Sequence, residues 1–251
     1  MIQVEHLYKY FSGREVLSDI STEFEQGKCN LIIGQSGSGK TVLMKCLIGL
    51  YGIDKGSIFY DRRNIAQMGK KERNLILREM GVLFQGGALF DSMSVYENVV
   101  FPLTMFSDLS LVQKRERVDF CLQRVRLEKA HDLYPSQLSG GMKKRVAIAR
   151  AIAFNPKYLF CDEPNSGLDP KTSIIIDQLI YEITQEFNTT TIINTHDMNS
   201  VMEIGDTVSF IYEGKLWWRG SNAQILQTDN EELRQFIYAS RFAQEIYQKR
   251  T

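Results

Sequence analysis

The chain has 251 residues, which fits one large domain or a core domain with a modest insertion, and it is long enough to fold without disulfides or a structural metal. Hydrophobic residues make up 43% and charged residues 24%, which is typical of a globular protein and excludes a disordered chain. Lys plus Arg and Asp plus Glu both number 30, so net charge gives no argument for nucleic acid or an acidic membrane as a partner.

The cysteines are scattered without a CxxC pair, which favours a reducing cytosol over a zinc site or disulfides: Cys29, Cys46, Cys121 and Cys161. Cys29 and Cys161 lie in apolar runs, where we expect them to act as small core residues. The first ten residues lack the basic and apolar regions of a secretory signal. No stretch reaches the ~18–20 apolar residues that cross a bilayer, so we expect any membrane role to be performed from the cytoplasmic side.

The first third of the chain is predicted to contain short strands and one helix. Broken apolar runs at 2–8 and 16–24 indicate strands, and 29–33 reads as a buried strand that ends at a glycine. Residues 40–50 have a helical apolar pattern, and another strand is expected at 57–60.

Residues 70–153 are mostly helical in pattern, with turns expected near Gly86-Gly87, Pro102, Pro135 and Gly140-Gly141. Strands at 158–161 and 190–193 flank a helix at 172–186, and this order is typical of a parallel sheet. Residues 206–218 are predicted to form a hairpin that turns at Glu213-Gly214, and the tail from about residue 221 is helical again. The pattern predicts an α/β core with a helical insertion.

Residues 34–41 match the phosphate-loop pattern G-x-x-x-x-G-K-[ST] between an apolar strand and a helix. Its glycines let successive backbone N–H groups point at phosphate oxygens, and the following helix adds its positive end. Lys40 can reach the β- and γ-phosphates, and the Thr41 hydroxyl can bind Mg²⁺. The four fixed positions arise by chance in roughly 1% of chains this long, so phosphate binding is the better interpretation.

Asp162 and Glu163 end the apolar strand at 158–161. Beside a phosphate loop, Asp162 would reach Mg²⁺ and Glu163 would orient and deprotonate a water. Taken alone, such a pair is more often an ordinary strand end.

Residues 138–145 place a serine and two glycines before a helix that opens with basic residues, which makes a second backbone site for an anion. Alone, this is a flexible helix start. Beside one phosphate loop, it suggests that the second site serves another copy of the chain.

The order of these motifs resembles the ABC ATPase family over nearly the whole chain: residues 34–41, Phe84-Gln85, 138–142, Asp162-Glu163, Ser166-Gly167-Leu168-Asp169 and Asn194-Thr195-His196-Asp197. The resemblance implies a P-loop NTPase fold with a RecA-like core, an antiparallel β layer and an inserted α-helical subdomain. We expect the core at 1–85 and 151–220, the helical signature subdomain at 86–150 and a C-terminal helical extension at 221–251.

The resemblance also implies ATP and Mg²⁺ as cofactors and a role for each matching residue. The catalytic residues would be Lys40, Gln85, Glu163 and His196, with His196 on the γ-phosphate. Mg²⁺ would be held by Thr41, Gln85 and Asp162. Nucleotide would be bound by Phe11 (stacked on adenine), Gly34, Gln35, Ser36, Gly37, Ser38, Gly39, Lys40 and Thr41, and in a head-to-tail dimer by Ser139, Gly140, Gly141 and Asp169 of the second copy. Core packing is the alternative for Phe11, because Tyr8 and Tyr10 lie close by in the sequence.

Residues 84–99 and the signature with Met142 are similar to Mla-type (MCE-associated) phospholipid transport ATPases, as is the Arg234-Gln235-Phe236 tail. The resemblance implies lipid cargo, an integral membrane permease docked at 86–98, an indirect MCE-type lipid-binding partner and a peripheral place on the bacterial inner membrane. For Ala88-Leu89-Phe90, docking of a permease helix and packing on the chain's own core are equally open.

The tail places a stripe of apolar residues at roughly helical spacing: Leu233, Phe236, Ile237, Phe242 and Ile246. Intrachain packing is the favoured interpretation, and contact with the neighbouring protomer is the alternative.

The sequence departs from the common family pattern in three places, namely Met142, Asn165 and Arg62-Arg63. None of these departures changes a residue that the resemblance assigns to hydrolysis. A nucleotide-gated regulator of the cell-division type would share every ATP motif and stays an alternative. Tandem ABC proteins that act on ribosomes or DNA are disfavoured, because there is one cassette and no basic excess.

Overall fold

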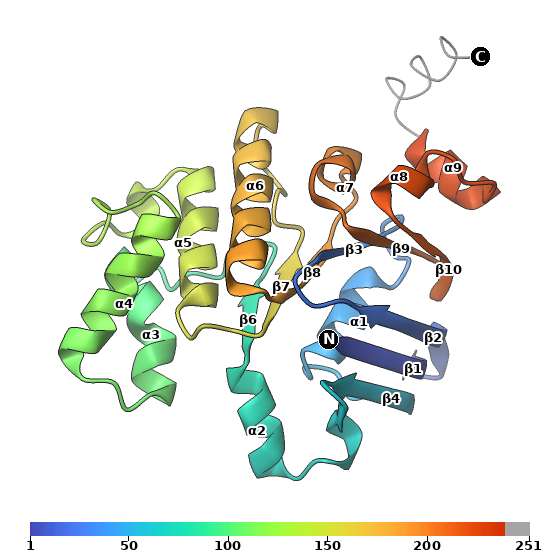
Figure 1. Ribbon diagram of the computed structural model, residues 1–251, viewed down its shortest axis with the longest axis horizontal. Coiled ribbons are helices and arrows are strands. Elements are labelled where there is room, and N and C mark those ends of the chain that lie inside the picture. The colour runs from blue at the N-terminus through green and yellow to red at the C-terminus, as the bar shows by residue number, and fades with distance from the viewer. Residues whose placement is uncertain (239–251) are drawn as a thin grey trace. The chain divides into compact units, whose positions relative to one another are not determined.

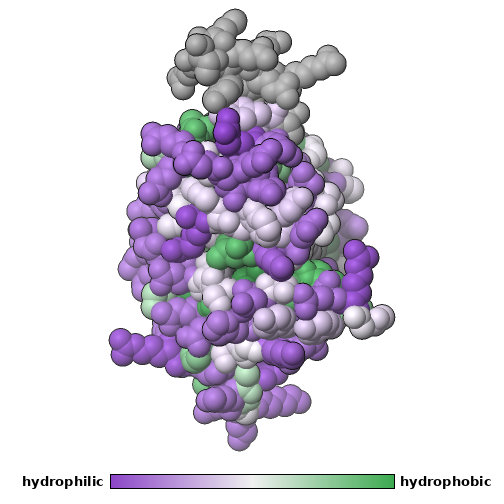
Figure 2. Space-filling model, turned by 90° about the vertical axis from the view of Figure 1, so that its right-hand side faces the viewer, coloured by the Kyte–Doolittle hydropathy of each residue, from purple (hydrophilic) through white to green (hydrophobic). Residues whose placement is uncertain are grey.

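The computed structural model describes residues 1–238, which divide into two compact units (Figure 1). The first unit combines residues 1–24 and 29–66 with residues 194–238, and the second combines 25–28 with 67–193. Among the described helices, none has both the length and the apolar content to cross a membrane. The face drawn in Figure 2 is mostly hydrophilic, with small hydrophobic patches.

An antiparallel sheet in the first unit has the strand order β2-β1-β4-β5. Its strands are β1 (Ile2–Phe11), β2 (Arg14–Phe24), β4 (Lys55–Tyr60) and β5 (Arg63–Asn64). Apolar side chains of the first two strands are fully buried and anchor the sheet to the core: Ile2, Leu7, Leu17 and Ile20. The broken apolar runs at 2–8 and 16–24 are therefore strands, as predicted.

The first unit also contains the parallel pair β3 (Cys29–Ile33) and β9 (Thr207–Tyr212). The hairpin predicted at 206–218 is confirmed, because β10 (Lys215–Gly220) pairs antiparallel with β9. Every residue of β3 is buried, and α1 (Lys40–Leu47) follows it after one loop. Strand, loop and helix thus stand in the order that the phosphate-loop pattern requires.

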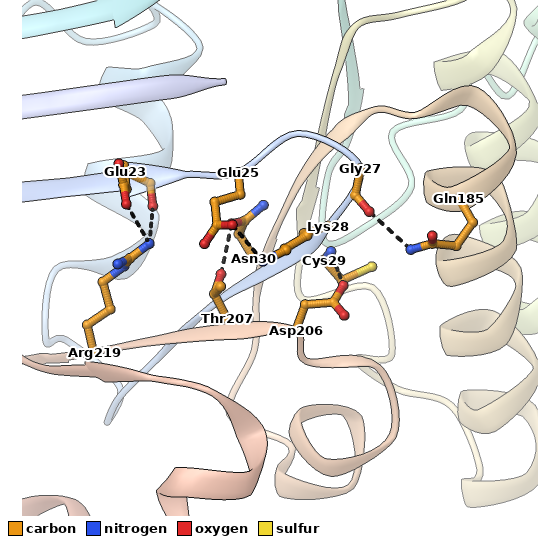
Figure 3. A network of polar contacts seen from close by, with 10 residues as sticks. All are labelled: Glu23, Glu25, Gly27, Lys28, Cys29, Asn30, Gln185, Asp206, Thr207 and Arg219. Carbon is orange, nitrogen blue, oxygen red and sulfur yellow. Dashed lines mark hydrogen bonds and ion pairs between the residues drawn. The ribbon is translucent and has the colours of Figure 1, made fainter.

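Polar contacts fasten the start of β3 to the segment that leads into β9 (Figure 3). The Cys29 N–H donates to the Asp206 carboxylate at 2.8 Å, and the Thr207 hydroxyl donates to the Asn30 side-chain oxygen at 2.8 Å. These bonds fix the position from which the chain enters the phosphate loop. Within the second unit, the Gln185 amide donates to the Gly27 carbonyl at 3.1 Å.

Three short helices complete the first unit: α7 (Met198–Ile204), α8 (Asn222–Ile225) and α9 (Glu231–Ile237). Leu233 and Ile237 of α9 are buried, and the Phe236 ring lies 5.6 Å from the Phe210 ring of β9. The described part of the apolar stripe therefore packs within the chain. Phe242 and Ile246 lie outside the described residues.

The second unit contains a group of packed helices, α3 (Val95–Phe106), α4 (Leu111–Arg124) and α5 (Gly140–Ile152) (Figure 1). Ser94 and Ser110 cap the first two, each accepting a hydrogen bond from a backbone N–H three residues on. This is the helical region expected after the phosphate loop. Short 3-10 turns lie at Ile65–Gln67 and Pro135–Gln137.

The remaining elements of the second unit are α2 (Lys70–Arg78), β6 (Met80–Leu83), β7 (Tyr158–Asp162), α6 (Pro170–Phe187) and β8 (Thr190–Asn194), whose last residue belongs to the first unit. Strands β7 and β8 and helix α6 confirm the predicted strand–helix–strand order, and β6 pairs parallel with β7. Parallel and antiparallel strands together with the helical group confirm the α/β class.

Two sequence expectations were wrong in this unit. Residues 80–83 form β6 rather than part of a helical stretch, because their pairing with β7 decides the conformation of an apolar run too short to show a period. Pro102 lies inside α3 rather than at a turn. The helix continues past it because its buried residues, which include Val99 and Leu103, pack on the neighbouring helices.

Candidate functional site

The loop between β3 and α1 has a conformation that only glycine accommodates at two positions. Gly34 has φ 149°, and a Cβ there would lie 2.2 Å from the Ile211 carbonyl oxygen. Gly39 has φ 109°, and its Cβ would lie 2.8 Å from Leu17 Cδ2. Both glycines therefore let the backbone curl into a cradle while it packs closely on its neighbours, which a side chain at either position would strike.

Lys40 and Ser38 point their polar atoms into this buried region. Lys40 is only 7% exposed, and its Nζ donates to the carbonyls of Gly34 at 2.7 Å and Gln35 at 2.9 Å. The Ser38 hydroxyl is buried without a hydrogen-bond partner among residues 1–238. A buried ammonium beside an unsatisfied hydroxyl at a helix N-terminus suits a polyanion such as a triphosphate.

The other loop residues assigned to nucleotide face solvent. Gln35, Ser36 and Gly37 are exposed, and Thr41 is exposed in the first turn of α1. A hydroxyl at this place is a suitable oxygen ligand for Mg²⁺. The fit of the loop to a triphosphate with its metal therefore rests on the glycine cradle, the buried lysine and this hydroxyl.

His196 and Phe11 also belong to the first unit. The Thr195 N–H donates to the Ile32 carbonyl at 3.1 Å, so the segment that carries His196 runs beside the strand leading into the phosphate loop. His196 itself is exposed. Phe11, at the end of β1, is 39% exposed, and its ring meets the Tyr51 ring edge-on at 5.2 Å. The Lys9 ammonium lies over the same ring, 5.1 Å from its centroid, so Phe11 is partly exposed and partly covered by its own neighbours.

In the second unit, β7 delivers the two acidic residues to its carboxyl end. Asp162 is only 9% exposed, and Glu163 is half-buried. Glu163 has φ 49°, a left-handed conformation that residues with a Cβ rarely adopt. Such strain persists only where surrounding contacts hold it, and here the Glu163 carbonyl accepts from the Ser166 N–H at 3.2 Å.

Gln85 lies at the same edge as these carboxylates. In the β6–β7 register Leu83 pairs with Cys161, so both strands end together. The Gln85 side-chain amide is exposed and donates to the Ser166 hydroxyl at 3.3 Å. The second unit thus brings together Gln85, Asp162 and Glu163, whereas Thr41 belongs to the first unit.

The predicted signature residues form the start of α5. Ser139 caps the helix, and its hydroxyl accepts from the Met142 N–H at 3.2 Å. Gly140 is exposed. A Cβ on Gly141 would lie 2.6 Å from Thr172 Cγ2, so this glycine also allows the close approach of α6. The exposed start of α5 can offer N–H groups to an anion.

Asp169 caps α6. Its carboxylate accepts from the Thr172 hydroxyl at 2.5 Å and from the Thr172 N–H at 3.0 Å. These bonds, the hydroxyl first, hold the pKa of Asp169 below its usual value. The side chain is exposed and oriented by its own helix.

Sequence reasoning missed one buried polar residue at this site. Lys144, one turn into α5, is 5% exposed, and its Nζ donates to the carbonyls of Gln85 and Glu163. Its burial could have been inferred from helical spacing, because Lys144 lies four and eight residues before Ile148 and Ile152, which are buried on the same helix face.

The model for the family described as "ABC transporter" matches residues 17–166. Among curated relatives, a probable ribonucleotide transport ATP-binding protein, mkl, of Mycobacterium leprae is 36% identical over 96% of this chain and 69% of its own length. The methionine import ATP-binding protein MetN of Campylobacter jejuni is 34% identical over 98% of this chain and 78% of its own length.

Two solved structures are similar in both fold and sequence. The dimeric post-hydrolysis state of the ATP-binding cassette MJ0796 bound to ADP and Pi has a TM-score of 0.80 and 29% identity, covering 88% of this chain and 99% of the other. CbiO1 from Clostridium perfringens, part of the ABC transporter complex cbiONQ, has a TM-score of 0.85 and 30% identity, covering 98% of each chain.

Proposed function

The chain belongs to the ABC transporter family, and from this premise we propose that two copies close head to tail on two ATP molecules and that each copy completes the site of the other. The chain is the ATP-binding subunit of an ABC transporter: it binds ATP with Mg²⁺ and hydrolyses it, and hydrolysis is coupled to transport through a membrane permease. The observation that carries the assignment is the glycine cradle with its buried Lys40.

We assign each site residue a role from the chemistry of its side chain. Lys40 balances the charge of the β- and γ-phosphates, and Thr41, Gln85 and Asp162 offer the oxygen ligands that Mg²⁺ prefers. Glu163 accepts the proton of the attacking water.

Outside this group, His196 holds the γ-phosphate, and Phe11 stacks on adenine. Residues 139–141 and Asp169 serve the site of the second copy. When bound, Mg²⁺ would neutralise negative charge on the phosphates.

The first test replaces the proposed base. We expect Glu163→Gln to bind ATP as the unaltered chain does, since the amide keeps the shape of the side chain. It should lose turnover by roughly 10²–10⁴-fold, because the amide cannot accept the proton. ATP binding by fluorescence, phosphate release and size-exclusion chromatography with ATP measure binding, turnover and the closed dimer.

Glu182→Gln is the matched control, because Glu182 is an exposed glutamate of α6 outside the proposed site. Its turnover should stay normal. Full multiple-turnover activity in Glu163→Gln would contradict the assignment of the base.

We further propose that the cargo is a phospholipid or related lipid and that the chain works at the cytoplasmic side of a bacterial inner membrane. The resemblance of residues 84–99 and Met142 to Mla-type ATPases supports this cargo and an indirect MCE-type lipid-binding partner. The names of the relatives offer ribonucleotides and methionine as competing cargoes.

The proposed permease contact is the segment at 86–98. Its backbone is held firmly, because Arg150 donates to the carbonyls of Gly87 at 2.8 Å and Ala88 at 2.7 Å. The side chain of the fully buried Asn98 accepts a hydrogen bond from the Phe90 N–H at 2.8 Å and donates one to the Phe90 carbonyl at 3.1 Å. Phe90 is nevertheless 41% exposed, so a rigid loop presents an apolar side chain of the kind that a short permease helix can cover.

Purification of the chain with its permease from detergent-solubilised membranes tests the cargo. We expect phospholipid in the complex by mass spectrometry, and ATP hydrolysis that rises with added phospholipid. Stimulation by methionine or a ribonucleotide instead would replace the lipid assignment and leave the ATPase assignment intact.

A further inference from the structure

Lys144 occupies an unusual place for a lysine. It lies on α5 one turn after the signature glycines, and 95% of its surface is removed from solvent. Its Nζ donates to the Gln85 carbonyl and, at 3.3 Å, to the Glu163 carbonyl. One ammonium therefore joins the signature helix to the loop after β6 and to the end of β7.

Burying this charge opposes folding. Desolvation lowers the pKa of Lys144, and electrostatic interactions with Cys161, Glu163 and Asp162 act in the opposite direction. An apolar side chain of similar length would fill the same space without desolvating a charge. What the lysine adds is a set of directed hydrogen bonds to two backbone carbonyls.

A second cation on the same helix holds the same loop. Arg150 donates to the carbonyls of Gly87 and Ala88, so α5 grips the backbone at residues 85, 87 and 88. On the other side, the Glu163 carbonyl is shared between Lys144 and the Ser166 N–H. The left-handed backbone of Glu163 is thus held by α5 as well as by its own turn.

We propose that Lys144 is a positioning residue that sets the orientation of Glu163 and couples it to the loop at 85–90. When the permease displaces this loop, the two cations move α5 with it, and Lys144 carries the displacement to the backbone of Glu163. The proposal rests on the functions proposed above for Gln85 and Glu163.

The test compares Lys144→Met and Lys144→Arg in the full chain assembled with its permease. Methionine keeps the length but donates no hydrogen bond, so we expect kcat to fall about 10- to 100-fold with KM for ATP unchanged. Stimulation of hydrolysis by the permease should also be lost. Arginine keeps donors for both carbonyls and should restore most of kcat and of the stimulation.

Hydrogen exchange gives a readout that does not depend on turnover. In Lys144→Met without nucleotide, amides at 85–88 and 163–166 should exchange faster, while those of α4 stay unchanged. Lys129→Met is the control, because Lys129 is an exposed lysine of the same unit. Its kcat, stimulation and exchange should match those of the unaltered chain.

Normal kcat and normal permease stimulation in a folded Lys144→Met variant would overturn the proposal. If that variant fails to fold, Lys144→Leu, which also donates no hydrogen bond, replaces it with the same expectations. Full turnover in Glu163→Gln would instead contradict the proposed role of Glu163 as the base, and the two failures are therefore distinguishable.

Discussion

At the scale of single residues, burial limits the reactivity of the four cysteine thiols. All four are buried and free, and burial raises the pKa of Cys46 and of Cys121 to about 11. A raised pKa favours the neutral thiol in the folded chain. Its contribution to stability is therefore complete below about pH 8.5 and declines as the pH rises toward the folded value.

We accordingly expect the native chain to react with a thiol reagent at pH 8 only as fast as it unfolds. In urea all four thiols should react at once, and the midpoint of urea unfolding should fall between pH 8 and pH 10. Absorbance of the released thiolate measures the reaction. Rapid labelling of a thiol in the native chain would contradict the burial described here.

Gly34 allows a second prediction at this scale. We expect Gly34→Ala to raise the Kd for ATP at least about tenfold and to lower the free energy of unfolding by about 1–3 kcal/mol, since its Cβ would strike the Ile211 carbonyl. Nucleotide titration and urea unfolding measure the two effects.

Gly52→Ala is the control for that substitution, because a Cβ at Gly52 meets nothing within 4 Å. This variant should bind ATP normally. Equal behaviour of the two variants would show that the cradle tolerates a side chain.

At the scale of elements, the sequence predicted best where a pattern is local and complete. Strand β3, its glycine loop and α1 are consecutive, so their order could be anticipated from one short stretch. Strand β6 could not, because four apolar residues take their conformation from pairing with β7, which is about 75 residues away.

The same distinction applies to the residues of the site. Asp162 and Glu163 are recognised because an apolar strand ends in two carboxylates. Lys143 and Lys144 are adjacent and chemically identical, and the sequence alone did not reveal that Lys144 turns inward to two carbonyls. The left-handed backbone of Glu163 is likewise a property of the folded turn.

At the scale of the whole molecule, two truncations of the C-terminal tail can separate its contribution to stability from a contribution to dimer formation. Deletion of residues 232–251 removes the buried Leu233 and Ile237, each contributing about 1.5–3 kcal/mol, and should lower the melting temperature by several degrees. Truncation after Tyr238 keeps both residues. We therefore expect it to keep the contribution of these two residues to the melting temperature, as measured by calorimetry, with the ATP-dependent dimer followed by size-exclusion chromatography.

Loss of the dimer in the shorter truncation, with an unchanged melting temperature, would instead assign residues 239–251 to contact with the neighbouring protomer.

At Glu163 the backbone conformation favours one residue for stability, whereas the proposed chemistry requires another. A glycine would adopt the same torsion at no steric cost, so the fold itself offers no reason to retain a carboxylate there. A screen for heat resistance or expression alone would therefore accept replacement of Glu163, because such a screen does not measure ATP hydrolysis. The proposed role of Glu163 as the catalytic base would explain an acid at this point, where a glycine would relieve the backbone.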